Sequence, residues 1–129
     1  MLVKLYELPP AAPAIEALAQ RGITVRRALP PEKHNVIAWV EWEFGQRWAS
    51  ECDVAFAHQP VGCFIAVREG AGDPKEILGF GCHDATCKNF FGPTGVRESE
   101  RGQGIGKALL LACLEAMRDQ GYAYAIIGG

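Results

Sequence analysis

The sequence predicts a single α+β domain, residues 1–129, in which helices flank a largely antiparallel sheet. The chain is long enough for one hydrophobic core and too short for two. Its hydrophobic fraction of 49% and charged fraction of 22% are those of an ordinary globular protein. The local patterns follow the order strand, two helices, three strands, helix and strand with short links, which is typical of a layered α+β domain.

The first 22 residues are expected to form an N-terminal extension of this domain. Residues 2–8 alternate weakly between apolar and polar side chains and predict a short strand. Residues 14–21 predict a short helix that ends at Gly22. Residues 23–29 begin with β-branched side chains and stand between Gly22 and a Pro-Pro pair, so they predict the first strand of the main sheet.

Two helices are predicted next. Apolar side chains recur at helical spacing along one face, at Ile37, Val40, Phe44 and Trp48. Gly45 is expected to separate this stretch into two helices, of which the second covers about residues 46–57.

The central strands are predicted over residues 61–68, 76–83 and 89–96. Residues 70–74 (GAGDP) predict a hairpin loop, and the short polar links favour antiparallel neighbours. A long amphipathic helix is predicted over residues 104–120, and a buried strand over residues 122–127 closes the pattern.

Charge and cysteine usage exclude several classes of function. A net charge of -2 favours neither a nucleic acid nor an anionic membrane surface. The five cysteines are an odd number without a CxxC pair, so neither a zinc site nor a disulfide framework is expected, and we interpret them as buried apolar side chains. No apolar run reaches the roughly 20 residues of a membrane span, and the N-terminus lacks a signal sequence, so a cytoplasmic location is expected.

The most informative segment is a glycine-rich turn directly before the long helix. Gly102, Gly104 and Gly106 alternate there, and the absence of Cβ atoms lets backbone N–H groups approach a ligand closely. A helix N-terminus adds unpaired N–H donors and a partial positive charge, both of which suit a pyrophosphate. Arg101 and Lys107 place full positive charges on either side.

Two other phosphate-binding motifs do not fit these residues. A Walker A loop requires glycine where Arg101 stands and Ser or Thr where Ala108 stands. The dinucleotide fingerprint requires a third glycine where Lys107 stands, and it belongs near the start of a βαβ unit. A nucleotide-binding protein is therefore disfavoured.

The pattern V-x-x-x-x-R-G-x-G-I-G-x-x-L, which runs from Val96 to Leu109, resembles the coenzyme A signature of the GNAT superfamily of N-acetyltransferases. The resemblance covers about residues 23–128. It implies a mixed, mainly antiparallel sheet that splays between its fourth and fifth strands, with acetyl-coenzyme A as co-substrate in the gap and no metal. The acceptor it implies is a small-molecule or peptide amine.

The resemblance also assigns roles to individual residues. Backbone groups of Thr94, Gly95 and Val96 would pair with the pantetheine arm, and the Val96 N–H would stabilise the oxyanion. Arg101 would contribute charge beside the pyrophosphate. The pyrophosphate itself would be held by backbone groups of Gly102, Gln103, Gly104, Ile105, Gly106 and Lys107.

The general base is less clearly indicated. The family's fourth-strand carboxylate position is occupied here by Phe90, and Asp84 is taken as the candidate base. The alternatives are His83, Glu41 and Glu43, each of which also fits an ordinary polar position. Trp39 and Trp42 are interpreted as packing residues rather than walls of an acceptor site, and a nucleophilic role for Cys82 or Cys87 is disfavoured.

The family normally continues past its fifth strand, whereas this sequence stops at Gly128-Gly129. Without more chain, the final strand is expected to have an unprotected edge. The polypeptide is therefore expected to be truncated or incompletely represented, or to receive the missing strands from a partner subunit in a homodimer. The continuation often carries a tyrosine that protonates the leaving thiolate, a role that Tyr122 and Tyr124 do not inherit. A non-catalytic acyl-coenzyme A binding or sensing module remains the alternative function.

Overall fold

The computed structural model describes residues 1–69 and 76–128, so the predicted hairpin loop at residues 70–74 lies outside the described residues. Six strands form one sheet in the order β1-β6-β5-β4-β3-β2. Every neighbouring pair is antiparallel except β5 and β6, which are parallel. This arrangement confirms the predicted mixed, mainly antiparallel sheet. The strands are β1 (Leu2–Lys4), β2 (Ile23–Arg27), β3 (Cys63–Arg68), β4 (Glu76–His83), β5 (Phe90–Val96) and β6 (Tyr124–Ile127).

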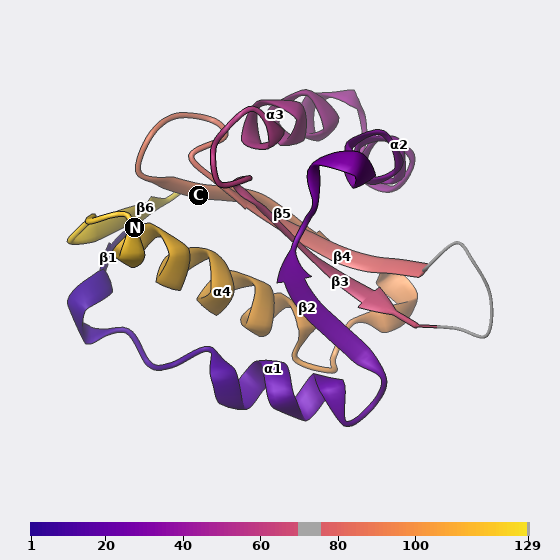
Figure 1. The fold of residues 1–129 in the computed structure, drawn as a ribbon, viewed down its shortest axis with the longest axis horizontal. Helices are drawn as coiled ribbons and strands as arrows, with labels where there is room; N and C mark the ends of the chain where they lie inside the picture. The colour runs from indigo at the N-terminus through magenta and orange to yellow at the C-terminus, as the bar shows by residue number, and fades with distance from the viewer. Residues whose placement is uncertain (70–75, 129) are drawn as a thin grey trace.

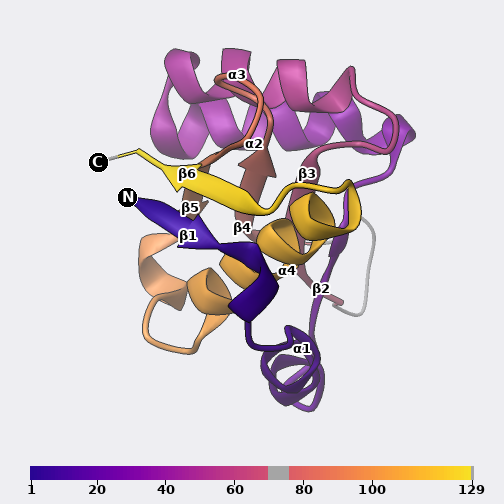
Figure 2. The ribbon, with the colours of Figure 1, turned by 90° about the vertical axis from the view of Figure 1, so that its left-hand side faces the viewer.

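Helices cover both faces of the sheet (Figures 1 and 2). On one face lie α2 and α3, and on the other lie α1 and α4. The described helices are α1 (Ala12–Ala19), α2 (Lys33–Phe44), α3 (Gln46–Phe56) and α4 (Ile105–Asp119). None of them is long and apolar enough to span a membrane.

The sheet separates two hydrophobic cores because successive side chains of a strand point to opposite faces. On β3, Ile65 and Val67 join the core beneath α2 and α3, whereas Ala66 joins the core beneath α1 and α4. Gly45 has a φ of 103° and separates α2 from α3, as the sequence predicts. Such a φ favours glycine, which has no Cβ to clash with the backbone.

The expectation of an unprotected edge on the final strand is wrong. Residues 2–8 are not one strand: β1 is followed by a 3-10 turn at Leu5–Glu7. β1 pairs antiparallel with β6 and covers its outer edge, with Leu2 opposite Ile126. The cause is Leu5, whose side chain is completely buried against α4 and β6 and holds the N-terminal segment there.

Candidate active site

The gap between β5 and β6 is the central feature of the site. The two strands pair only at Phe90 and Phe91, which lie opposite Ile126 and Ile127. Beyond that point the β4–β5 register shifts, and β5 carries one residue more than β4 between the pairs His83–Phe91 and Gly81–Thr94. Such an extra residue forms a β-bulge, which bends a strand and tolerates a proline such as Pro93. β5 then continues beside β4 alone, so the sheet splays where the family resemblance implies.

The open edge of β5 presents unpaired backbone groups to this gap. The Arg97 N–H donates a hydrogen bond to the Leu78 carbonyl on β4, at 2.8 Å. Because the backbone groups of successive residues alternate in direction along a strand, those of Gly95 point toward β4 and those of Thr94 and Val96 point away from it. The Val96 carbonyl accordingly accepts a hydrogen bond from Nε of Arg101, at 3.2 Å, instead of pairing with β4.

The glycine-rich turn lies between β5 and α4. Gly102 and Gly104 have φ values of 87° and 91°, a region that glycine tolerates, and a Cβ added at either would meet open space. The first backbone bond of α4 runs from Ala108 N–H to the Gly104 carbonyl. Within the described chain, no backbone N–H of residues 102–107 donates a hydrogen bond. This run of free donors at a helix N-terminus is suited to bind an anion.

Side chains stabilise the turn from outside. Nη1 of Arg21 donates to the Gln103 carbonyl at 3.3 Å, and Nε2 of Gln103 donates to the Glu100 carbonyl at 3.2 Å. The Glu100 carboxylate also forms an ion pair with Arg68, which lowers the pKa of that carboxyl. The side chain of Gln103 is therefore held within the loop by Glu100.

The turn and the open strand edge are in contact. A Cβ at Gly106, in the first turn of α4, would lie 3.8 Å from Cγ2 of Val96. The first turn of α4 therefore lies next to the Val96 side chain on β5.

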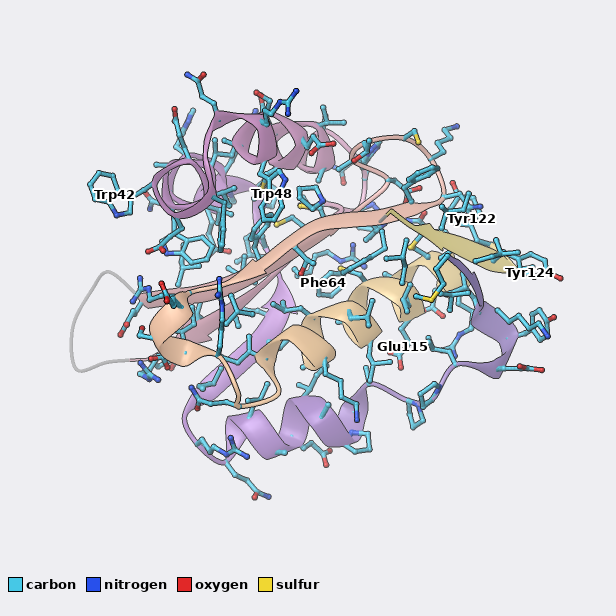
Figure 3. The ribbon with its side chains drawn as sticks, turned by 180° about the vertical axis from the view of Figure 1, so that it is seen from behind. Trp42, Trp48, Phe64, Glu115, Tyr122 and Tyr124 are labelled. Atoms are coloured by element: carbon cyan, nitrogen blue, oxygen red, sulfur yellow. The ribbon has the colours of Figure 1, made fainter. Side chains whose placement is uncertain are left out.

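A cavity of about 380 Å³ lies on the α3 side of this gap. α3 contributes Trp48 and Glu51, and the β4–β5 connection contributes Thr86. Figure 3 shows Trp48 between α3 and the sheet. The remaining lining residues are Phe90, Phe91, Gly92, Pro93, Thr94, Ile127 and Gly128. The cavity thus combines aromatic and aliphatic walls with one carboxylate.

Glu51 is the site residue that the sequence interpretation missed. Among the described residues that line the cavity, it is the sole ionisable group. The Thr86 hydroxyl donates a hydrogen bond to the Glu51 carboxylate and fixes its position. One feature of the sequence points to Glu51. It lies three residues after Trp48, so the two share a face of α3, next to the buried positions Ala49 and Cys52.

Asp84, the predicted base, lies in the connection that follows β4 and does not line the cavity. Its Oδ2 is 2.7 Å from Nδ1 of His83, and its Oδ1 accepts a hydrogen bond from the Asn89 N–H at 2.8 Å. Both oxygens therefore stabilise the connection. Burial lowers the pKa of His83, and the neighbouring Asp84 carboxylate offsets this only in part.

The other candidate side chains lie away from the cavity. Glu41 is exposed, and Glu43 lies 3.5 Å from Nε of Arg97. Trp39 packs edge-on against Phe44 and Phe80, in agreement with its predicted packing role. The packing role predicted for Trp42 is wrong, because its side chain is 87% exposed and points away from the molecule (Figure 3).

The two tyrosines near the C-terminus also lie outside the lining. Tyr124 stacks edge-to-face with Tyr6 at the outer edge of the sheet, where Figure 3 also shows Tyr122. Neither of them is among the described residues around the cavity. That neither tyrosine protonates the leaving thiolate stays a prediction.

Comparisons with known proteins agree with this geometry. No curated protein matches the chain significantly. A solved GCN5-related N-acetyltransferase from Sphaerobacter thermophilus is 27% identical with a TM-score of 0.72, and the match covers 98% of this chain and 40% of that one. A putative acetyltransferase from Pyrococcus horikoshii is 26% identical with a TM-score of 0.52, covering 76% of this chain and 35% of that one.

A third solved structure shares the fold at 13% identity and a TM-score of 0.72. It is a GCN5-related glucosamine N-acetyltransferase region of a fungal multi-domain β-N-acetylglucosaminidase, and the match covers 96% of this chain and 17% of that one. The chain thus spans less than half the length of each of these structures. The model of the acetyltransferase (GNAT) family matches residues 32–128, most of the sequence. The chain therefore belongs to the GNAT family of acetyltransferases.

Proposed function

We propose that this chain is an N-acetyltransferase domain that moves the acetyl group of acetyl-coenzyme A to a primary amine by direct attack in a ternary complex. The observation that carries the proposal is the run of unpaired N–H groups over residues 102–107, which ends in the turn of α4 next to Val96 of β5. This surface matches a long ligand with a doubly anionic pyrophosphate at one end and amide groups along its arm. Family membership supplies the acetyl-coenzyme A chemistry.

In this proposal the turn binds the pyrophosphate through its backbone, and the exposed Arg101 and Lys107 side chains add positive charge. The open space next to the α-carbons of Gly102 and Gly104 leaves room for phosphate oxygens close to the backbone. Thr94 and Val96 pair with the pantetheine amides as an added strand would. This alignment brings the thioester to the cavity where β5 and β6 separate.

The proposed reaction uses one backbone group of β5, two residues beyond the cavity residue Thr94, and one side chain that lines the cavity. The Val96 N–H faces the gap and donates to the oxygen that becomes negative when the amine attacks the thioester carbonyl. An amine that arrives as an ammonium ion must first lose a proton. We assign this role to Glu51, which lines the cavity, in preference to Asp84, whose carboxylate oxygens are engaged in the β4–β5 connection.

The second candidate function is a non-catalytic acyl-coenzyme A binding module. It is favoured by Phe90, an apolar side chain at the position where some family members carry a carboxylate. Release of the coenzyme A thiol, measured over a panel of primary amines, distinguishes the two functions. Thiol release with at least one amine supports the transferase, and cofactor binding without release for any amine supports the module.

The cofactor site is tested by Gly104→Val, with Gly121→Val as the matched control. Both glycines flank α4, have φ values of 91° and 102°, and face open space, so both substitutions strain the backbone similarly. Only Gly104 lies among the free N–H donors. Isothermal titration should show that Gly104→Val abolishes coenzyme A binding while Gly121→Val retains it. Unchanged affinity in the folded Gly104→Val variant would contradict the assignment.

A further inference from the structure

Three cysteines from three different elements meet beneath α3. Cys52 lies on α3, Cys63 on β3 and Cys82 on β4, and the β3–β4 register places Cys63 directly opposite Cys82. Their sulfur atoms all lie within 4.8 Å of one another, and those of Cys52 and Cys63 are 3.9 Å apart. None of the three side chains has any exposed surface. The sequence spacing shows no such group, because the fold assembles it from distant segments.

The surroundings of this trithiol cluster (Cys52, Cys63 and Cys82) are apolar. The three residues belong to the core beneath α2 and α3, with neighbours such as Ala49, Val61 and Ala85. No fourth histidine, cysteine or carboxylate joins the cluster among the described residues. Burial raises the pKa of the Cys82 thiol. A species bound here therefore has three sulfur donors and must leave little net charge, because burying an unpaired charge is costly.

These two conditions select among thiophilic ions. Zn²⁺ prefers four ligands, and with three thiolates it would carry a net negative charge and an open position. Cu⁺ with three thiolates would leave two negative charges in the core. A trivalent, three-coordinate ion satisfies both conditions, because three thiolates neutralise it and complete its coordination.

We propose that Cys52, Cys63 and Cys82 form a binding site for trivalent arsenic, taken up as neutral arsenous acid. Three As–O bonds break and three As–S bonds form. Each thiol proton leaves with one hydroxide as water, so that three water molecules are released. The oxidation state of arsenic is unchanged, and the net charge of the core stays zero.

The position of the cluster connects it to the cavity. Cys52 directly follows Glu51 on α3, and Cys82 lies on β4 opposite the bulge of β5. Bound arsenic would link α3 covalently to β3 and β4, directly below the wall that Trp48 and Glu51 provide. The site is independent of the proposed acetyl transfer, since none of its three sulfurs lines the cavity.

The test is refolding of the full chain from urea in the presence of sodium arsenite and a non-thiol reductant, followed by native mass spectrometry. Refolding gives the reagent access to sulfurs that are buried in the native state. The expected product carries one arsenic and has lost three protons, with near-ultraviolet sulfur-to-arsenic absorption. The double variant Cys87→Ala/Cys113→Ala retains only the three cluster cysteines and should form the same adduct.

Variants that remove a cysteine of the cluster should not form the adduct. Cys63→Ala and Cys82→Ala should lose the three-thiol adduct, whereas Cys113→Ala, which removes a buried cysteine of the other core, should retain it. A folded double variant without the adduct, or an unchanged adduct in Cys63→Ala, would overturn the proposal.

Discussion

At the scale of single residues, Glu51 and Asp84 are two carboxylates with different surroundings. Glu51 lines the cavity and accepts one hydrogen bond from Thr86, whereas Asp84 is 8% exposed and contacts both His83 and Asn89. A base must reach the proton of the bound amine, and under the proposed function Glu51 faces the cavity in which that amine would lie. These surroundings support the proposal that Glu51, which the sequence analysis did not consider, is the base in place of Asp84.

The substitution Glu51→Gln tests this assignment. Glutamine keeps an oxygen that accepts from Thr86 but cannot take up a proton, so kcat for amine acetylation should fall about 10²-fold with KM for acetyl-coenzyme A unchanged. The exposed Glu41→Gln serves as the matched control and should leave kcat unaltered. A loss of kcat in Asp84→Asn, together with a fully active Glu51→Gln, would return the role to Asp84.

His83 predicts a pH dependence of stability. Its side chain is fully buried, and burial lowers its pKa below the ordinary value of 6.5 that applies in the unfolded chain. As the pH falls below 6.5, the unfolded chain gains a proton that the folded chain does not, so the free energy of unfolding decreases. The decrease for one such group is at most about 1.4 kcal/mol per pH unit.

Urea unfolding at pH 7.5 and pH 5.5 measures this effect. His83→Asn should reduce the difference between the two pH values, because its amide does not titrate. The exposed His34→Asn is the control and should retain the difference. Equal pH dependence in the wild type and His83→Asn would show that another group is responsible.

At the scale of elements, the contact between α2 and β5 positions the site. A Cβ at Gly95 would lie 2.5 Å from the Phe44 ring, so the ring at the end of α2 packs directly on the strand that is proposed to bind the pantetheine arm. Phe44 also packs against Trp48, a cavity residue, with ring centroids 5.3 Å apart. The glycine at 95 is thus required by this close approach.

Gly95→Ala should therefore destabilise the fold by roughly 1–3 kcal/mol through overpacking. The double variant with Phe44→Leu should recover part of this loss, because the smaller side chain vacates the space. Gly81→Ala is the control on the neighbouring strand, since its nearest contact would be 3.4 Å. Urea unfolding of the double-mutant cycle measures the coupling, and additive effects of the two substitutions would contradict it.

The elements that the sequence predicts well are those defined by local patterns. The division of α2 from α3 at Gly45, the three central strands and α4 all follow from periodicity and glycine positions. The prediction places the first helix at residues 14–21, but α1 begins at Ala12, because Pro13 is tolerated in the first turn of a helix. β1 was harder to predict because three residues carry little pattern and its pairing with β6 joins opposite ends of the chain.

The distinction between local patterns and contacts of distant segments also applies to the site. The turn at residues 101–107 is contiguous, so its anion-binding character can be predicted from its glycines and its place before a helix. The cavity is not contiguous, because α3, β5 and the end of β6 supply its walls. Glu51 is one acidic residue on an amphipathic helix, and only the tertiary structure distinguishes it from Glu41.

At the scale of the whole molecule, the candidate cofactor site crosses the sheet. The free donors belong to the glycine-rich turn and the start of α4 on one face, and the cavity lies under α3 on the other. The gap between β5 and β6 lies between them. A ligand that occupies all three regions contacts both layers of the domain and requires the folded chain. Its binding energy should therefore stabilise the entire fold.

This coupling predicts a thermal shift. Coenzyme A at 100 times its Kd should stabilise the native state by about 2.7 kcal/mol, because it binds only the folded chain. With an unfolding entropy of roughly 2.1 cal/mol/K per residue, this corresponds to an increase in Tm of about 10 °C for 129 residues. Scanning calorimetry measures the shift, which should disappear in Gly104→Val and persist in Gly121→Val.

ATP and NAD at the same concentration should leave Tm unchanged, because the turn lacks the residues of their motifs. An equal shift with ATP would indicate a general phosphate site instead of one for coenzyme A.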